Sequence, residues 1–166
     1  MILAATKQIP ETQNERMKRK VEFLTSAARA DQFPQAGLPE VAFLGRSNVG
    51  KSSLINALVG QEGVAKTSST PGRTRLVNFF RVENAFHLVD MPGYGYAKVP
   101  RDMSEAWGQL IESYLRQRET LRLCVILIDA RRGWMQPDRD LINWLAFHNR
   151  PFVVAATKVD KLNQKE

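Results

Sequence analysis

The chain has 166 residues, of which 43% are apolar, and it carries a formal net charge of +7. This length is that of one ordinary domain, and the composition excludes disordered and fibrous classes. No segment approaches the ~20 apolar residues of a membrane helix, and the single cysteine, Cys124, cannot form a disulfide within the chain. We therefore expect a cytoplasmic monomer without a membrane partner.

The first part of the chain consists of a basic segment, a strand and a loop. Residues 1–20 are polar and basic, and we expect a mobile arm or a short helix. Their RMKRK sequence at 16–20 either contacts RNA or is a solvated segment, because a positive charge attracts polyanions without proving a specific partner. Residues 21–26 alternate like a strand, and a loop rich in proline, glycine and glutamine follows at 31–39.

The centre of the chain predicts a strand, a helix and a hairpin. A short apolar run at 41–44 ends at a glycine-rich loop, and helical spacing follows at 52–58. A polar loop is expected at 60–74. The strand-like segments 75–82 and 85–89 are so close in sequence that they predict an antiparallel hairpin.

The remaining elements complete an α/β pattern. They are a loop at 93–100, a helix at 102–118, an apolar strand at 123–128, a helix at 137–148 and an apolar strand at 152–156. Apolar strands alternating with helices predict three layers, with a mostly parallel sheet covered on both faces and one antiparallel edge hairpin. Right-handed crossovers would place the glycine loop and the other strand ends along one edge.

The most specific motif is a phosphate-binding loop between the strand 41–44 and the helix 52–58. It fits G-x-x-x-x-G-K-[ST] and consists of Gly45, Arg46, Ser47, Asn48, Val49, Gly50, Lys51 and Ser52. The glycines let successive N–H groups point at phosphate oxygens, and the helix adds its positive end. We expect Lys51 to reach the β- and γ-phosphates and the Ser52 hydroxyl to bind Mg²⁺.

A second motif follows the hairpin and consists of Asp90, Met91, Pro92 and Gly93. On its own, an aspartate before Pro-Gly is an ordinary turn. At the end of a strand that reaches the same edge as the phosphate loop, the Asp90 carboxylate can hold Mg²⁺ through a water molecule. Gly93 can present its backbone N–H to a γ-phosphate.

The third motif consists of Thr157, Lys158, Val159 and Asp160, directly after the last apolar strand. An aspartate here can accept hydrogen bonds from both N1–H and the 2-amino group of guanine, a pair of donors that adenine lacks. Lys158 can lay its methylene stem along the base plane. Alone, T-K-x-D is a common surface sequence, but with the other two motifs it predicts a site for GTP and GDP.

In this order, the motifs resemble those of the translation-factor-related GTPases, and most of all the EngB family (also called YihA or YsxC). The resemblance covers about residues 21–160, and its most specific parts are GRSNVGKSSLINAL at 45–58, TSSTPGRTR at 67–75, LVDMPGYGYAKVP at 88–100 and TKVD at 157–160. It implies a GTPase (G) domain over 21–166. It also implies a role in assembly of the large ribosomal subunit and an association with normal cell division and septation.

The resemblance further implies a loop threonine that closes over Mg²⁺ and the γ-phosphate. Thr70 and Thr74 are both available, and Thr74 is preferred because it lies in the family's PGRT sequence. The nucleotide would also be lined by Gly72, Arg73, Thr74, Arg75 and Leu76. The expected Mg²⁺ ligands are then Ser52, Thr74 and Asp90. Bound GTP would order segments 65–74 and 93–100, and hydrolysis would release them.

Two residues bear on the rate of hydrolysis. Tyr94 stands where many GTPases carry a glutamine that orients the attacking water, and tyrosine is a poor substitute. Asn48 matches an asparagine that helps to hold a potassium ion in related GTPases, although it can equally stabilise a turn. We predict slow hydrolysis stimulated by potassium or by the ribosome, with Lys51, Asn48, Thr74 and Gly93 as the catalytic residues.

Three functions stay open at this point. The first is a switch whose loops and basic surface meet ribosomal RNA, with Tyr94 and Tyr96 either stacking on bases or packing internally. The second is an RNA-binding assembly factor that uses GTP only structurally, and the third is a P-loop ATPase or kinase, which gives Asp160 no role. Family members continue beyond the position of Glu166 with another strand and a helix. We therefore expect weaker nucleotide binding and lower stability than in longer relatives.

Overall fold

The computed structural model describes residues 18–65, 76–94 and 101–162, and within the second helix it describes side chains from Gly108 onward. In this part of the chain, the sheet strands are β1 Val21–Ala27, β2 Glu40–Gly45, β3 Val77–Val82, β4 Phe86–Asp90, β5 Leu121–Asp129 and β6 Phe152–Thr157. The helices are α1 Lys51–Val59, α2 Arg101–Gln117 and α3 Gln136–Phe147, and short 3-10 turns lie at η1 Ala30–Gln32 and η2 Val159–Lys161.

The strands form one mixed sheet in the order β1-β3-β4-β2-β5-β6. The neighbours β4, β2, β5 and β6 are parallel, whereas β3 is antiparallel to both β1 and β4. This confirms the predicted α/β fold with a mostly parallel sheet and an antiparallel hairpin. Because β1 pairs with the outer side of β3, the sheet extends one strand beyond the hairpin. Alternation in the sequence predicted that strand but could not identify its partner.

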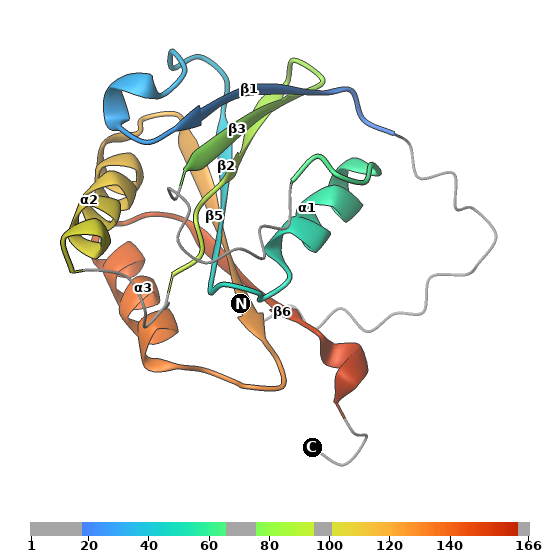
Figure 1. Cartoon of the computed structure of the whole chain (residues 1–166), viewed down its shortest axis with the longest axis vertical. Coiled ribbons are helices and arrows are strands. Elements are labelled where there is room, and N and C mark those ends of the chain that lie inside the picture. Colours follow the sequence, from blue (N-terminus) through green and yellow to red (C-terminus); the bar gives the residue numbers. More distant parts are fainter. Residues whose placement is uncertain (1–17, 66–75, 95–100, 163–166) are drawn as a thin grey trace.

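Helices cover both faces of the sheet, with α1 on one side and α2 and α3 on the other (Figure 1). The core beneath α2 and α3 includes Phe79, Tyr114 and Leu145, and Cys124 is fully buried in it, as predicted. A second core, which contains Ile55 of α1, lies on the opposite face. Successive residues of β2 alternate between the two cores, as expected of a strand buried on both faces.

The hairpin between β3 and β4 turns on two residues with left-handed backbone, Glu83 at φ 51° and Asn84 at φ 54°. Two such residues match the right-handed twist of the flanking strands, so the tight connection predicted from the sequence is formed. Backbone bonds also attach the end of the basic segment: Arg19 N–H donates to Val59 O at 3.1 Å, and Glu83 N–H donates to Lys20 O at 2.8 Å. Residues 1–17 lie outside the described residues, so the expected mobile arm stays a prediction.

A buried ionic cluster lies at the amino edge of the sheet, where β2 begins. The fully buried carboxylate of Glu40 accepts hydrogen bonds from Arg118 Nη2 at 2.7 Å and from the Tyr114 hydroxyl at 2.8 Å, and His87 Nδ1 lies 3.4 Å away. Burial alone would raise the pKa of Glu40, but the hydrogen bonds from Arg118 and Tyr114 outweigh it and lower the pKa. The cluster ties β2 to α2 at the end of the sheet opposite to the predicted motifs.

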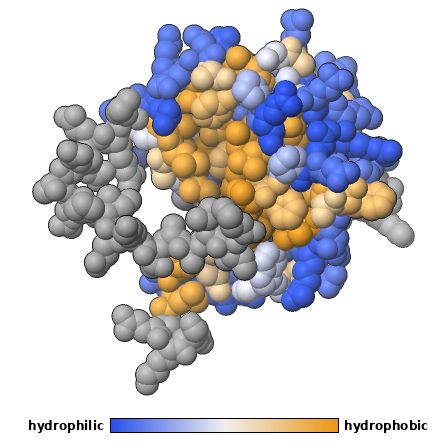
Figure 2. Space-filling view, turned by 180° about the vertical axis from the view of Figure 1, so that it is seen from behind, coloured by the Kyte–Doolittle hydropathy of each residue, from blue (hydrophilic) through white to orange (hydrophobic). Residues whose placement is uncertain are grey.

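The last strand is less covered than the others. No residue of β6 is buried, and Val153 is 39% exposed. The space-filling view from behind shows a hydrophobic area in the centre of the surface (Figure 2). None of the described helices has the length and apolar character that a membrane-spanning segment requires.

Candidate functional site

The three sequence motifs meet at the carboxyl edge of the sheet. Gly45 is the last residue of β2, Asp90 is the last of β4 and Thr157 is the last of β6. Since β4, β2, β5 and β6 run in the same direction, these ends share one edge. The fold therefore brings together residues that are far apart in sequence, as predicted.

The phosphate-binding loop adopts a backbone that only certain residues tolerate. Gly50, which precedes α1, has φ 105°, and Asn48 has φ 62°. A Cβ on Gly45 would lie 2.8 Å from Val49 Cγ1 and 3.2 Å from Leu127 Cβ, so a side chain has no room there. Helix α1 begins at Lys51, and its N-terminal end therefore lies directly after the loop, where it favours an anion.

Lys51 and Asp90 form an ion pair at the base of this loop, with side chains that are 12% and 8% exposed. The lysine comes from the first turn of α1 and the carboxylate from the end of β4. A cation that can move to phosphates and a carboxylate that can take a metal thus lie side by side. Ser52 follows Lys51 in the same turn.

The oxygen atoms of Ser52 and Asp90 are of the kind that Mg²⁺ prefers as ligands. Nucleotide-bound Mg²⁺ takes one or two protein oxygens and completes its shell with phosphates and waters. Among the described residues there is no cluster of three or more His, Cys, Asp or Glu side chains that would form an all-protein metal site. Thr74 lies outside the described residues, as do Gly72, Arg73 and Arg75, and Leu76 is half-buried directly before β3.

The segment from Asp90 to Tyr94 lies along the first half of the loop. Met91 N–H donates to Phe43 O at 3.1 Å, Tyr94 N–H to Gly45 O at 3.2 Å, and Ser47 N–H to Tyr94 O at 3.3 Å. A Cβ on Gly93 would lie 2.8 Å from Ser47 Oγ and 2.9 Å from Ser47 N, so this approach requires glycine.

Not every residue assigned to the nucleotide presents its side chain to the site. Met91 is fully buried and packs in the core beneath α2 and α3. Val49 is buried in the opposite core. A contact of either residue with a nucleotide would therefore come from its backbone.

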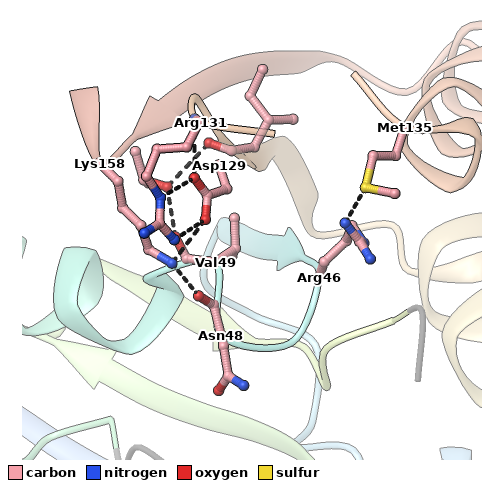
Figure 3. Close-up of polar contacts among 9 residues, drawn as sticks. Arg46, Asn48, Val49, Asp129, Arg131, Met135 and Lys158 are labelled. Atoms are coloured by element: carbon pink, nitrogen blue, oxygen red, sulfur yellow. Dashed lines mark hydrogen bonds and ion pairs between the residues drawn. The ribbon is translucent and has the colours of Figure 1, made fainter. Parts of the chain in front are cut away.

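The third motif, Thr157 to Asp160, is attached to the phosphate loop through hydrogen bonds (Figure 3). The Thr157 hydroxyl donates to Val49 O at 2.6 Å. Lys158, with φ 60°, donates from Nζ to Asn48 O at 2.6 Å and lies 3.0 Å from the Asp129 carboxylate. Asp160 lies in η2 and is exposed at the same edge. The segment predicted to recognise the base is thus connected directly to the phosphate loop.

Sequence reasoning missed Asp129 and Arg131. Asp129 is the last residue of β5, and Arg131 donates to it from Nε at 2.9 Å and from Nη2 at 2.7 Å. The hydrogen bond from Arg131 lowers the pKa of Asp129 against the effect of desolvation, and Lys158 adds to this. The signal that could have found Asp129 is a carboxylate at the end of the remaining parallel strand.

The prediction that Tyr94 either stacks on RNA or packs internally is resolved in favour of packing. Its side chain packs against the core beneath α2 and α3, and its hydroxyl donates to Asp138 Oδ1 at 2.9 Å. Tyr96 lies outside the described residues.

Comparison with known proteins identifies the class to which this site belongs. Residues 40–158 match the family model described as "50S ribosome-binding GTPase". The chain is therefore a P-loop GTPase, which binds guanine nucleotides and hydrolyses GTP.

Individual relatives narrow the class further. The chain is 59% identical over 147 residues to "Probable GTP-binding protein EngB" of Solibacter usitatus, covering 89% of this chain and 77% of that protein. It is 56% identical over 146 residues to the protein of the same name from Desulforamulus reducens, covering 87% and 71%. The chain belongs to the EngB family of GTP-binding proteins. This confirms the family predicted from the motifs and sets aside the ATPase and kinase alternatives.

Solved structures agree with this assignment. "Crystal structure of a probable GTP-binding protein engB" matches with a TM-score of 0.59 and 26% identity, covering 75% of this chain and 73% of that one. Era in complex with MgGDPNP and a fragment of 16S ribosomal RNA matches with a TM-score of 0.55 and 25% identity, covering 76% and 42%.

Proposed function

We propose that the protein is a GTP-driven switch in the assembly of the large ribosomal subunit, acting as a cytoplasmic monomer, and that this role is needed for normal cell division and septation. The observation that carries the proposal is the junction at the carboxyl edge. There Lys51 pairs with Asp90, while Lys158 binds the carbonyl of Asn48 in the phosphate loop. One continuous unit can therefore contact both the phosphates and the base.

Three observations support a ribosomal partner. The matching family is described as ribosome-binding. The chain carries a net charge of +7, and a basic protein associates readily with RNA. Era, a solved GTPase with the same fold, was crystallised with a fragment of ribosomal RNA.

Different residues of the site bind the phosphates, Mg²⁺ and the base. Lys51 exchanges Asp90 for the β- and γ-phosphates, while backbone amides of the loop surround the phosphate oxygens. Ser52 and Asp90, with Thr74, would hold Mg²⁺. Mg²⁺, when bound, neutralises charge on the β- and γ-phosphate oxygens. Gly93 N–H donates to the γ-phosphate. The Asp160 carboxylate accepts hydrogen bonds from N1–H and the 2-amino group of guanine.

Intrinsic hydrolysis is slow in this scheme because Tyr94 does not orient the attacking water. Its hydroxyl is engaged by Asp138. A further group must stimulate hydrolysis. The two candidates are a potassium ion near Asn48, which would stabilise charge where other GTPases use an arginine finger, and the ribosome. The Asn48 side chain points away from Lys158 and Asp129 (Figure 3), so a contact with an ion would leave their bonds intact. Equal single-turnover rates in potassium and sodium buffers would reject the potassium candidate.

Sedimentation with purified large subunits tests the switch. We expect co-sedimentation with a non-hydrolysable GTP analogue and Mg²⁺, and release with GDP. Binding that does not depend on the nucleotide would overturn the switch.

The packed Tyr94, whose hydroxyl is bonded to Asp138, also favours a second candidate, an RNA-binding assembly factor for which GTP is only structural. A variant that binds GTP but cannot hydrolyse it separates the two functions. Retention on the subunit supports the switch, whereas normal release supports the structural use of GTP.

A further inference from the structure

Tyr94 and Asp138 form a contact that no sequence motif explains. It joins helix α3 to the segment from Asp90 to Tyr94, whose Gly93 is predicted to meet the γ-phosphate. Asp138 lies in the first turn of α3 and is only 1% exposed. One carboxylate oxygen accepts from the Tyr94 hydroxyl at 2.9 Å, and the other accepts from Met135 N–H at 3.0 Å. A single buried carboxylate thus caps α3 and holds Tyr94.

The backbone of Tyr94 is fixed from the opposite side. Its N–H donates to Gly45 O, and its carbonyl accepts from Ser47 N–H. Tyr94 is therefore held between the phosphate loop and α3, and the residue directly before it is Gly93. Because Gly93 is bonded to Tyr94, a shift of Tyr94 would move the Gly93 backbone, which lies so near Ser47 that a Cβ would not fit.

A second contact links the phosphate loop to the start of α3. The Arg46 side chain extends away from the Asp129–Lys158 cluster and donates to the Met135 sulfur (Figure 3). Met135 is the residue that precedes α3. The start of α3 is therefore bound both to the phosphate loop and to the segment that follows Gly93.

We propose that Asp138 is a positioning residue of this GTPase: through the Tyr94 hydroxyl, it fixes Gly93 beside Ser47, where the Gly93 N–H can meet a γ-phosphate. This rests on the proposed role of Gly93. Since GTP has a γ-phosphate and GDP has none, the contact contributes to the binding of GTP and not to that of GDP. A loosened segment would have to be ordered again whenever GTP binds, which lowers the apparent affinity for GTP.

The hydrogen bond between Tyr94 and Asp138 does not depend on pH within the physiological range. Burial, together with the hydrogen bond to Asp138, raises the pKa of Tyr94 well above its usual range. The hydroxyl therefore remains protonated and donates throughout the physiological pH range.

The chain offers a matched control for this contact. At the amino edge, the Tyr114 hydroxyl donates to Glu40 Oε2 at 2.8 Å, which is also a tyrosine–carboxylate bond with a buried acid. Tyr114→Phe and Tyr94→Phe both remove one hydroxyl. Only Tyr94 borders the predicted nucleotide site.

The experiment measures the dissociation constants of GDP and of a non-hydrolysable GTP analogue, with Mg²⁺, by titration calorimetry. The proteins are wild type, Tyr94→Phe, Asp138→Asn, the double variant and Tyr114→Phe. We expect Tyr94→Phe to weaken analogue binding about tenfold, as the loss of one charge-assisted hydrogen bond would, with GDP binding changed less than about twofold. Asp138→Asn should act similarly. The double variant should add nothing, since each change removes the same charge-assisted hydrogen bond.

The control separates positioning from stability. Tyr114→Phe should lower the thermal midpoint but leave the ratio of the two affinities as in wild type. An unchanged ratio in Tyr94→Phe, or a joint loss of both nucleotides, would mean that Asp138 only stabilises α3. If Asp138→Asn does not fold, Tyr94→Phe and Tyr114→Phe by themselves give the comparison. A wild-type chain that binds neither nucleotide would instead overturn the proposed function.

Discussion

The two ends of β2 lie in the same sheet but hold their charges differently. At the amino edge, Glu40 is fully buried and is bonded to Arg118 and Tyr114. The guanidinium of Arg118 also lies 6.0 Å from the ring centre of Phe33 and 5.9 Å from that of Phe79. Protein groups therefore surround this carboxylate and its arginine partner.

At the carboxyl edge, charged groups pair across different loops instead of around one acid. Lys51 pairs with Asp90, and Lys158 pairs with Asp129. Left-handed backbone at Asn48, Gly50 and Lys158 accompanies these pairs. We infer that the amino edge stabilises the fold. At the carboxyl edge, the paired side chains are those that we propose to exchange their protein partners for a nucleotide.

The largest effect should come from Arg118→Ala at the amino edge. It leaves the Glu40 carboxylate buried without its main partner, which costs about 3–5 kcal/mol. Denaturant unfolding measures the loss, and nucleotide affinity of the folded protein should stay unchanged. Arg116→Ala is the control, because this arginine lies two residues earlier, in the last turn of α2, and its side chain is 61% exposed. A comparable loss in the control would contradict the role of the cluster.

Lys51→Ala should have the next largest effect, and it should reverse the pattern. Loss of a cation that stabilises charge on the phosphates should lower the single-turnover rate of GTP hydrolysis by about 10²–10³-fold. The loss of stability should be smaller than that of Arg118→Ala. Arg132→Ala, which removes an exposed cation near the same edge, is the control. The contrast between the two edges would be wrong if Lys51→Ala lowered the free energy of unfolding as much as Arg118→Ala but left the hydrolysis rate nearly unchanged.

Sequence analysis predicted each element that local patterns encode. The hairpin followed from two adjacent strand patterns, and the site followed from three motifs at strand ends. What it missed are pairs of residues that meet only after folding. Tyr94 and Asp138 are 44 positions apart, and Glu40 and Arg118 are 78 apart. No local period marks such partners, because the crossovers of the sheet set which elements adjoin.

Asp160→Asn should change base preference at the carboxyl edge without changing stability, because the residue is exposed. Asparagine replaces one acceptor oxygen by a donor, which suits xanthine better than guanine. We expect the affinity ratio of guanosine to xanthosine triphosphate to fall by about 100-fold, within the range for a lost polar contact in a specific site. The free energy of unfolding should change by less than about 0.5 kcal/mol, as for exposed positions in general. An unchanged ratio would disprove base recognition by Asp160.

The smallest expected effect is a difference in how acid and salt act on the two edges. Hydrogen bonding lowers the pKa of Glu40 and that of Asp129 in the folded state. Each carboxylate therefore stabilises the fold above the ordinary pKa of about 4 and loses this contribution as pH falls through its lowered value. Glu40→Gln should reduce the acid-induced fall of the thermal midpoint by about 2–4 °C, equivalent to about 1 kcal/mol.

Asp129→Asn should have a smaller effect than Glu40→Gln, and only at low salt. Arg131, the partner of Asp129, is 41% exposed, whereas Arg118, the partner of Glu40, is 11% exposed. At 1 M salt the screening length is about 3 Å, so exposed pairs weaken while buried ones persist. Thermal melts of both variants from pH 7 to pH 3, at low and high salt, make the comparison. Equal sensitivity to salt would show that the two acids occupy similar environments, and the distinction between the two edges would fail there.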